Sequence, residues 1–285
     1  RENLSKSLVA SKRLKKGHII TSEDVIVRSP GQGLSPQKFE ELLGIELTHD
    51  MNEEDYFFET DIDNNLIEPR AYKFSRPWGI PVRHHDFNQY NKRINPDIYE
   101  FHLSYSDMDL NLNNYFKGEY QSGFVVHAPE LFEKSKLLDL ATDDSLYRNE
   151  SIQNMQKVID LTRDLKKFFP NTPKPMIVTN IGGFSMDEPF SQEKIEDCYN
   201  IFSDSLDKLD LEGVEMIPQT MAPFPWHFGG QRFQNLFVYP NEIIYWCNKL
   251  NLRMCFDVSH SRLLCNHAQI NFYEFAEQIA PITGH

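Results

Sequence analysis

Acidic and histidine side chains recur where predicted strands end. Asp257-x-x-His260 places a carboxylate and an imidazole three residues apart, Glu215 is assigned to the end of the preceding strand, and His127 ends an earlier one. Carboxylate oxygens and imidazole nitrogens suit Mn²⁺, Mg²⁺, Co²⁺ or Zn²⁺, and such an ion with an open position polarises a sugar carbonyl. One chemistry that this pattern indicates is therefore a divalent-metal site.

The same residues also have a purely structural interpretation. Asp257 is placed to cap the following helix, His260 to bond a loop backbone, and His127 to be a buried histidine without a ligand role. Spacing alone leaves both interpretations open.

Other polar residues lie near the same strand ends. Glu100 and His102 stand two apart on one predicted strand, so they share a face and are candidates for substrate contact or proton transfer. Arg83 and His85 follow the first strand and are candidate substrate contacts. The loop around Trp226 is rich in aromatic, proline and glycine residues, so it either stacks on a sugar ring or plugs the barrel.

The elements that must position these residues alternate between short apolar strands and long helices. The strand candidates are 79–82, 99–103, 123–127, 176–179, 214–217 and 254–257, and a seventh begins at Ile282. Such alternation predicts an α/β fold, a (β/α) TIM-type barrel over residues 73–285, with functional side chains at the carboxyl ends of the strands. Because an eight-fold barrel needs more strands than are found before His285, we expect the barrel to be truncated after strand 7.

Residues 1–60 do not show this alternation of strands and long helices. They combine two short strands, a Pro- and Gly-rich loop at 30–33 and a helix that begins after Ser35. We expect so small a unit to have little core of its own and to lean on a neighbour. The acidic, poorly periodic segment 61–72 is predicted to be a linker.

Composition limits the possible partners. The chain has 285 residues and a formal net charge of −13, so it repels phosphate backbones and anionic membranes, and we expect neither nucleic acid nor membrane as a partner. No apolar run approaches the ~18 residues of a membrane span, and the N-terminus does not resemble a signal peptide. The four cysteines form no C-x-x-C pair, which is typical of thiols in a reducing compartment. These features predict a cytoplasmic protein.

Three segments in residues 1–60 carry a family resemblance: Ser7-Leu8-Val9-Ala10, Lys16-Gly17 and Arg28-Ser29-Pro30-Gly31-Gln32-Gly33-Leu34-Ser35-Pro36. They resemble the antifreeze-like (SAF) domain of the sialic acid (N-acetylneuraminate) synthase family. The resemblance implies a domain that assists sugar binding by a synthase barrel and reaches into the partner subunit of a homodimer. In that family an arginine just before Pro-Gly touches the N-acyl group of the sugar. Here Ser29 precedes Pro30 directly, and Arg28 is the candidate for that contact.

Three later segments carry a second resemblance: Val126-His127-Ala128-Pro129, Val214-Glu215-Met216-Ile217-Pro218 and Phe256-Asp257-Val258-Ser259-His260. They are similar to the xylose-isomerase-like barrel superfamily of sugar isomerases, epimerases and endonuclease-IV-type enzymes, and Gly284-His285 looks like the start of its His-x-His strand. The resemblance implies that Glu215 and Asp257 are metal ligands, and that His127 and His260 are ligands or substrate contacts. Because further ligands of that family would lie beyond His285, we expect weak or absent metal binding by this chain.

Together the two resemblances imply part of a fused protein that makes nonulosonic, sialic-acid-like sugars. The barrel is then a divalent-metal-dependent isomerase or epimerase domain that acts on a sugar or sugar phosphate. The alternative is a non-catalytic sugar-binding or dimer-positioning module. A DNA-repair nuclease is disfavoured by the net charge of −13.

Overall fold

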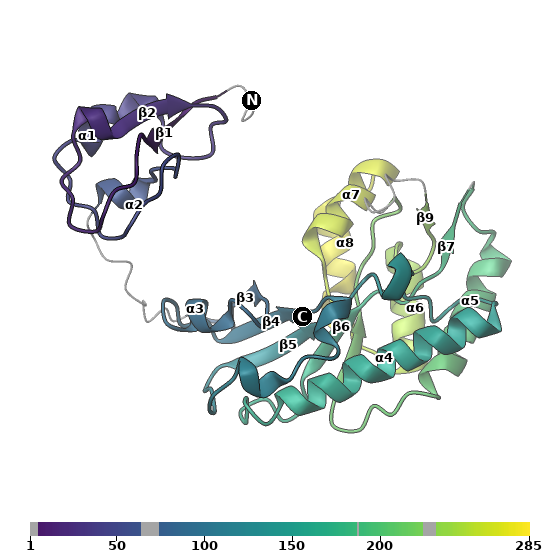
Figure 1. Cartoon of the computed structure of the whole chain (residues 1–285). Coiled ribbons are helices and arrows are strands. Elements are labelled where there is room, and N and C mark those ends of the chain that lie inside the picture. The colour runs from purple at the N-terminus through teal and green to yellow at the C-terminus, as the bar shows by residue number, and fades with distance from the viewer. Residues whose placement is uncertain (1–4, 64–73, 187, 225–231) are drawn as a thin grey trace. The chain divides into compact units, whose positions relative to one another are not determined.

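The computed structural model of the chain describes residues 5–63, 74–186, 188–224 and 232–285. The chain folds as two compact units, Arg1–Glu68 and Pro69–His285 (Figure 1). Each unit has its own secondary structure and its own buried core, and the two are described separately.

The first unit is built around a short antiparallel pair in which Ser7 faces Arg28. Ten apolar side chains, among them Leu8, Leu34 and Phe57, form a buried cluster, so the expectation that this unit has little core of its own is wrong. Two strands and four short helical turns pack around one common core. They bury more apolar surface together than the two strands would bury alone. The elements are β1 (Ser7–Ala10), β2 (Val25–Arg28), α1 (Phe39–Leu42), α2 (Glu59–Ile62) and 3₁₀ turns at Ser22–Asp24 and Pro36–Lys38.

Ser7 fixes the loop that follows β2. Its hydroxyl donates to the carbonyl of Pro30 at 3.0 Å and accepts from the backbone N–H of Gly33 at 2.8 Å. A Cβ on Gly31 would lie 2.2 Å from Ser5 Cβ, and one on Gly33 would lie 2.7 Å from the carbonyl oxygen of Phe57. Since real Cβ atoms do not come so close to their neighbours, both positions require glycine.

The second unit contains a curved parallel sheet in the order β3-β4-β5-β6-β8. The predicted strands are found within one residue of their expected starts at β3 (Gly79–Val82), β4 (Ile98–His102), β5 (Gly123–His127), β6 (Met176–Thr179) and β8 (Glu215–Pro218). The sheet continues through two single parallel bridges, Gln219 with Cys255 and Met254 with Thr283. Residues 254–256 and 283–285 therefore stand where the sixth and seventh strands were predicted, as bridged segments rather than full strands.

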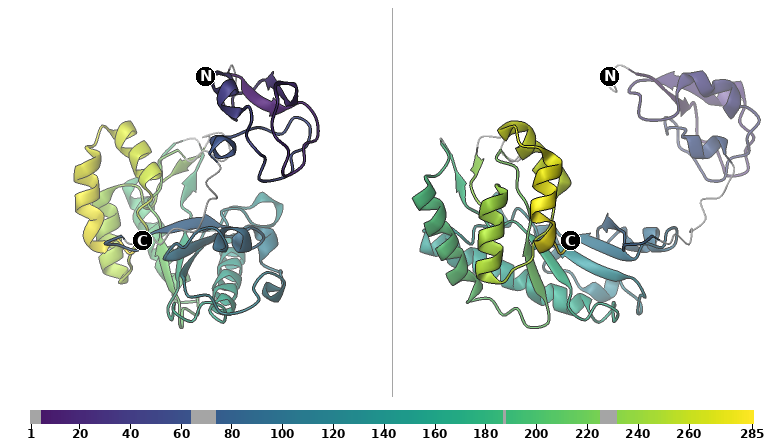
Figure 2. Two further views of the ribbon diagram at one scale, coloured as in Figure 1. Left: turned by 90° about the vertical axis from the view of Figure 1, so that its left-hand side faces the viewer. Right: turned by 180° about the vertical axis from the view of Figure 1, so that it is seen from behind.

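Helices cover the outer face of this sheet (Figures 1 and 2). α7 begins directly after Asp257, which caps its first turn, as the structural interpretation of that residue predicts. A two-residue pair, β7 (Phe184–Ser185) and β9 (Phe233–Gln234), joins two loops. The helices are α3 (Phe87–Asn91), α4 (Ser145–Leu165), α5 (Gln192–Leu206), α6 (Pro240–Leu250), α7 (Val258–Ala268), α8 (Phe272–Ile279) and 3₁₀ turns at Tyr105–Asp107, Leu112–Asn114, Glu133–Ser135 and Ala280–Ile282.

Alternation along the strands separates two layers of side chains. Tyr99 and Phe101 of β4 pack outward into a large aromatic core beneath the helices. Val125, Val178, Ile217 and Cys255 form a separate small cluster, against which Ile98 packs, on the inner face of the sheet. Since side chains alternate along a strand, Glu100 and His102 share the inner face with Ile98 and point into the barrel.

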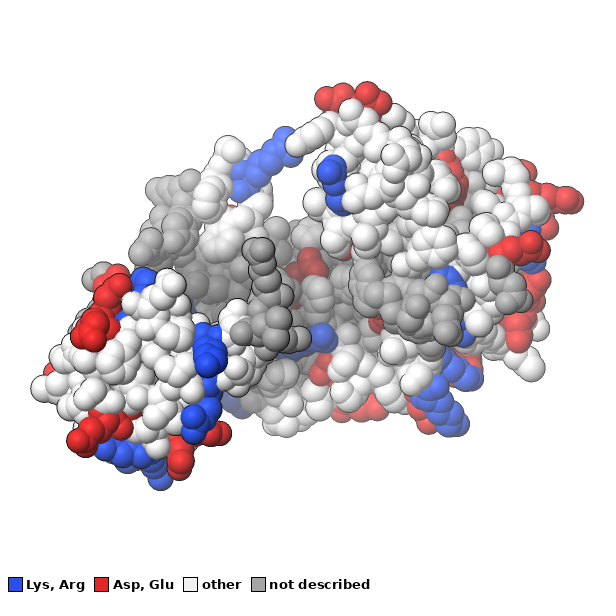
Figure 3. Space-filling model, turned by 90° about the horizontal axis from the view of Figure 1, so that it is seen from above, with Lys and Arg blue, Asp and Glu red and all other residues white. Residues whose placement is uncertain are grey.

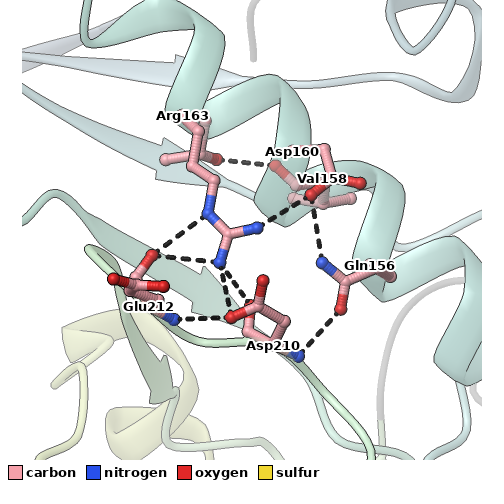
Figure 4. A network of polar contacts seen from close by, with 7 residues as sticks. Gln156, Val158, Asp160, Arg163, Asp210 and Glu212 are labelled. Carbon is pink, nitrogen blue, oxygen red and sulfur yellow. Dashed lines mark hydrogen bonds and ion pairs between the residues drawn. The ribbon is translucent and has the colours of Figure 1, made fainter.

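Arg163 of α4 anchors the turn that leads into β8 (Figure 4). Its guanidinium donates to the carbonyl of Asp210 at 2.8 Å and to that of Glu212 at 3.0 Å, and it pairs with the Asp160 carboxylate at 3.0 Å. The side-chain oxygen of Gln156 accepts a hydrogen bond from the backbone N–H of Asp210 at 3.0 Å. This polar network sets the position at which β8 begins.

No helix among the described residues is both long and apolar enough to cross a membrane. On the face drawn in Figure 3, basic and acidic side chains of the described residues are interspersed. Such mixing is typical of an ordinary solvated surface.

Candidate functional site at the barrel mouth

A carboxylate on the inner face of β4 joins two histidines. Glu100 Oε1 lies 2.5 Å from Nε2 of His102, and Glu100 Oε2 lies 2.7 Å from Nε2 of His285. Burial would raise the pKa of Glu100, but the hydrogen bonds and charges of the two imidazoles outweigh it and hold this pKa well below its usual range. An ionised carboxylate only accepts, so each histidine presents Nε2–H to it and keeps Nδ1 for another partner.

A second pair lies against the first. The rings of His102 and His127 stack at 4.6 Å with 19° between their planes. Nδ1 of His127 is 3.0 Å from the carbonyl of Ala128, and Nε2 is 3.3 Å from Oε1 of Gln219. Burial, followed by the neighbouring His102, lowers the pKa of His127, which favours the neutral ring.

Gln219 carries an unused polar atom at this point. It is 2% exposed, and its side-chain nitrogen has no hydrogen-bond partner among the described residues. The Ala128 carbonyl can only accept, so the neutral His127 ring carries its proton on Nδ1 and its Nε2 is an acceptor. The Gln219 amide can therefore donate to Nε2 if its NH₂ group, rather than its oxygen, faces the ring. In either orientation one buried polar atom of Gln219 is left for a ligand, and buried atoms of this kind bind ligands or water.

Glu215 does not lie at the mouth. It is the first residue of β8, at the amino end of the strand, and Arg253 donates to both of its oxygens at 2.7 Å. The guanidinium holds the pKa of Glu215 below its ordinary value. The prediction that Glu215 ends its strand is wrong, because β8 runs on to Pro218 and the inner-face residue at its carboxyl end is Gln219.

Asp257 and His260 have the contacts of the helix-cap interpretation. Asp257 Oδ1 accepts from the backbone N–H of His260 at 2.8 Å and from the Ser259 hydroxyl at 2.7 Å. His260 is 3% exposed, and its Nδ1 lies 2.8 Å from the carbonyl of Thr220.

The predicted metal ligands were tested against a divalent ion. No group of three or more His, Cys, Asp or Glu side chains in the described segments is arranged to hold a metal. Both oxygens of Glu215 bind Arg253, and both oxygens of Glu100 bind imidazoles. The donor set described here does not fit a divalent metal, and we derive no step through one.

The predicted substrate contacts lie in different places. Arg83 follows β3 and donates through one terminal nitrogen to the carbonyl of His102, which holds it at the carboxyl end of the sheet. His85 is exposed in the turn before α3. Arg28 belongs to the first unit, is 54% exposed and lies 3.5 Å from Glu54. Trp226 lies outside the described residues.

A buried acid ties together two loops at the carboxyl end of the sheet. Asp139 Oδ1 accepts from the backbone N–H groups of Ala141 at 3.0 Å and Gly183 at 3.1 Å. A Cβ on Gly182 would lie 2.0 Å from that oxygen. Burial raises the pKa of Asp139 to about 6. The loops that follow β5 and β6 are thereby held against each other.

Sequence reasoning missed Gln219, and it assigned no role to His285. The signal for Gln219 was present, because a period of two from Ile217 places it on the inner face beyond the strand. The contact between His285 and Glu100 joins residues 185 positions apart and has no local signal.

A parallel sheet covered by helices, with polar side chains at its carboxyl ends, defines an (β/α) barrel of the TIM type. A family model described as the xylose isomerase-like TIM barrel matches residues 93–282, and a model of the SAF domain matches residues 5–62. The chain belongs to the xylose isomerase-like TIM barrel family, and it carries an N-terminal SAF domain. Both resemblances are confirmed at this level.

Several solved structures are similar to the chain. A D-tagatose 3-epimerase-like protein has 18% sequence identity and a TM-score of 0.45, over 71% of this chain and 72% of that one. A xylose isomerase domain protein from Planctomyces limnophilus has 12% identity and a TM-score of 0.48, over 74% and 73%. An L-ribulose 3-epimerase has 12% identity and a TM-score of 0.43, and the chain covers 58% of its length. A comparison with curated proteins finds no match.

Proposed function

We propose that the barrel binds a sugar at its mouth and moves a proton on it, as an isomerase or epimerase domain. The observation that carries this proposal is the Glu100–His102 pair on the inner face of β4, in which Glu100 Oε1 lies 2.5 Å from His102 Nε2. A carboxylate that orients an imidazole is the usual arrangement for a histidine base.

His102 is the general base in this proposal. Glu100 accepts its Nε2–H, which leaves the Nδ1 lone pair to remove a proton from the carbon beside the sugar carbonyl. The C–H electron pair forms a carbon–carbon double bond, the carbonyl π pair moves onto the oxygen, and the product is an enediolate. Glu100 stabilises the imidazolium on His102, which in aldose–ketose conversion gives the proton to the neighbouring carbon while the hydroxyl proton of the first carbon passes to the enediolate oxygen. In epimerisation the first carbon takes a proton from water on its opposite face, and His102 gives its own proton back to water.

Gln219 and His127 supply the second part of the site. The unpartnered amide atom of Gln219 lies in a buried position and binds one oxygen of the sugar. His127 stacks on His102 and holds the amide in place, so it acts as a positioning residue. A fixed polar atom costs no reorganisation during reaction, which is why preorganised groups accelerate it.

The SAF domain supports the wider proposal that the chain is part of a fused, dimeric protein that makes sialic-acid-like sugars. In this proposal the SAF domain assists sugar binding by a synthase, and Arg28 makes the contact. The loop after Arg28 is rigid, because Ser7 bonds it at both ends and two glycines allow close packing.

A second candidate function is sugar binding without turnover. It is favoured by the bonds of Asp257 and His260 to backbone groups, which give both residues a structural role. In this case the barrel binds a sugar through Gln219 and Arg83 but moves no proton.

The test is an NMR assay of epimerisation and aldose–ketose interconversion on a panel of hexoses, N-acetylhexosamines and their phosphates. We expect one substrate class to turn over, and His102→Gln to lower kcat by at least 100-fold with little effect on KM. His267→Gln, on α7, is the matched control. Binding without turnover by the native chain would select the second function, and neither binding nor turnover would refute both.

A further inference from the structure

The guanidinium of Arg83 is held at the barrel mouth, and among the described residues it has no acidic partner. Val82, the last residue of β3, packs into the outer core opposite Phe101 of β4. Alternation therefore places Arg83 on the inner face, beside His102, and its bond to the His102 carbonyl keeps it there. Within the described residues, no Asp or Glu side chain lies within ion-pair distance of this guanidinium.

The carboxylates around it are already engaged. Glu100 binds His102 and His285. Asp86 accepts from the backbone N–H of Arg83 at 2.7 Å, and so closes the turn after β3 rather than pairing with the guanidinium. Asp107 accepts from the backbone and hydroxyl of Ser104 at 2.6 and 2.7 Å. In the described part of the chain, none of these three carboxylates forms an ion pair with Arg83.

The hydrogen-bond donors of the Arg83 guanidinium indicate which ligand group it binds. A guanidinium presents five N–H donors in a planar fork, and the His102 carbonyl occupies one terminal nitrogen. The remaining edge matches the paired oxygens of a phosphate or a carboxylate, and binds them more strongly than a sugar hydroxyl. In a chain of net charge −13, such a cation at the mouth attracts an anionic ligand that the rest of the molecule repels.

We infer that the ligand of the barrel is an anionic sugar whose phosphate or carboxylate binds Arg83 beside His102. This inference rests on the proposed function and deepens it, since it resolves whether the sugar is charged. His102 contacts Arg83 through its backbone and Glu100 through its ring, so the anionic group sits next to the base.

The experiment is isothermal titration calorimetry on the full chain with D-fructose, fructose 6-phosphate, D-fructuronate and inorganic phosphate. The variants are Arg83→Gln, Arg83→Lys and the control Arg93→Gln, which removes an exposed arginine after α3. We expect at least one anionic sugar to bind tenfold or more tightly than fructose, with a preference that weakens in salt. Arg83→Gln should abolish the preference, Arg83→Lys should keep part of it, and Arg93→Gln should keep all of it.

The ligands and variants of this experiment distinguish a failure of the inference from a failure of the proposed function. A preference for the 6-phosphate alone identifies a phosphate ester, and a preference for the uronate alone identifies a carboxylate. Equal binding of fructose and both anionic sugars, or a preference that survives Arg83→Gln, overturns the inference and leaves the proposed function intact. If no sugar binds the native chain, both are refuted.

Discussion

Glu242 makes the stability of the barrel depend on pH. Its Oε1 accepts from the hydroxyl of Tyr199 and from the backbone N–H of Phe237 at 3.1 Å. The Tyr199 ring stacks on Trp246 at 4.5 Å, which joins α5 to α6. Burial raises the pKa of Glu242 from 4.5 to about 7, despite the hydrogen bond from Tyr199.

The sign and size of the effect follow from linkage. A carboxyl whose pKa is higher in the folded state binds its proton more tightly there, so its contribution is fully present below pH 4.5 and is lost as pH rises through about 7. At ~1.4 kcal/mol per pKa unit the loss has a ceiling of about 3 kcal/mol. Glu242→Gln keeps an acceptor for Tyr199 and Phe237 but cannot ionise, so it should lack this loss.

The assay is urea unfolding at pH 5, 6, 7 and 8, followed by tryptophan fluorescence. We expect Glu242→Gln to be about as stable as the native chain at pH 5 and more stable at pH 8 by about 1–3 kcal/mol. Glu196→Gln, an exposed residue of α5, should follow the native profile. A stability difference between Glu242→Gln and the native chain that does not change with pH would refute this reasoning.

Three further predictions concern other parts of the chain. Arg163→Lys should lower the free energy of unfolding of the barrel by about 1–2 kcal/mol, because lysine cannot bond two carbonyls and a carboxylate at once; urea unfolding measures this, and a change no larger than that of Lys157→Arg contradicts it. Ser7→Ala should expose the backbone amide of Gly33 to hydrogen exchange without unfolding the SAF core, whereas unchanged protection of that amide would show that Ser7 does not hold the loop. Titration with Mn²⁺ or Zn²⁺ in a calorimeter should show no tight binding by this chain; submicromolar binding that is lost in Asp257→Asn would contradict the reading of the donor set.

The sequence predicted the strands of the sheet better than it predicted which side chains stand at their carboxyl ends. The five strands were found because each is a short, mostly apolar run between helices, and the shared face of Glu100 and His102 follows from a period of two. Both ends of β8 were predicted within one residue, as 214–217 against Glu215–Pro218. Glu215 was nevertheless assigned to the carboxyl end, although the predicted range already places it near the amino end.

Contacts between distant segments could not be predicted. The bond between Glu100 and His285 depends on how far the sheet curls, which no local pattern encodes. The spacing of Asp257 and His260 fits both a helix cap and a metal site, and the structure shows that Asp257 caps α7. A period of two from Ile217 places Gln219 on the inner face, but the sequence does not show that its amide is buried with an unpartnered atom.

The central claim is that Glu100 and His102 form a proton-transfer pair. It is tested most directly by deuterium exchange at the carbon beside the carbonyl of a bound sugar in D₂O, followed by proton NMR, which detects the half-reaction without net turnover. We expect the native chain to exchange this proton, Glu100→Gln to slow exchange by at least tenfold and to change its pH profile, and His102→Gln to abolish it. Exchange that is equally fast in both variants, or absent from the native chain with a bound sugar, would contradict the account.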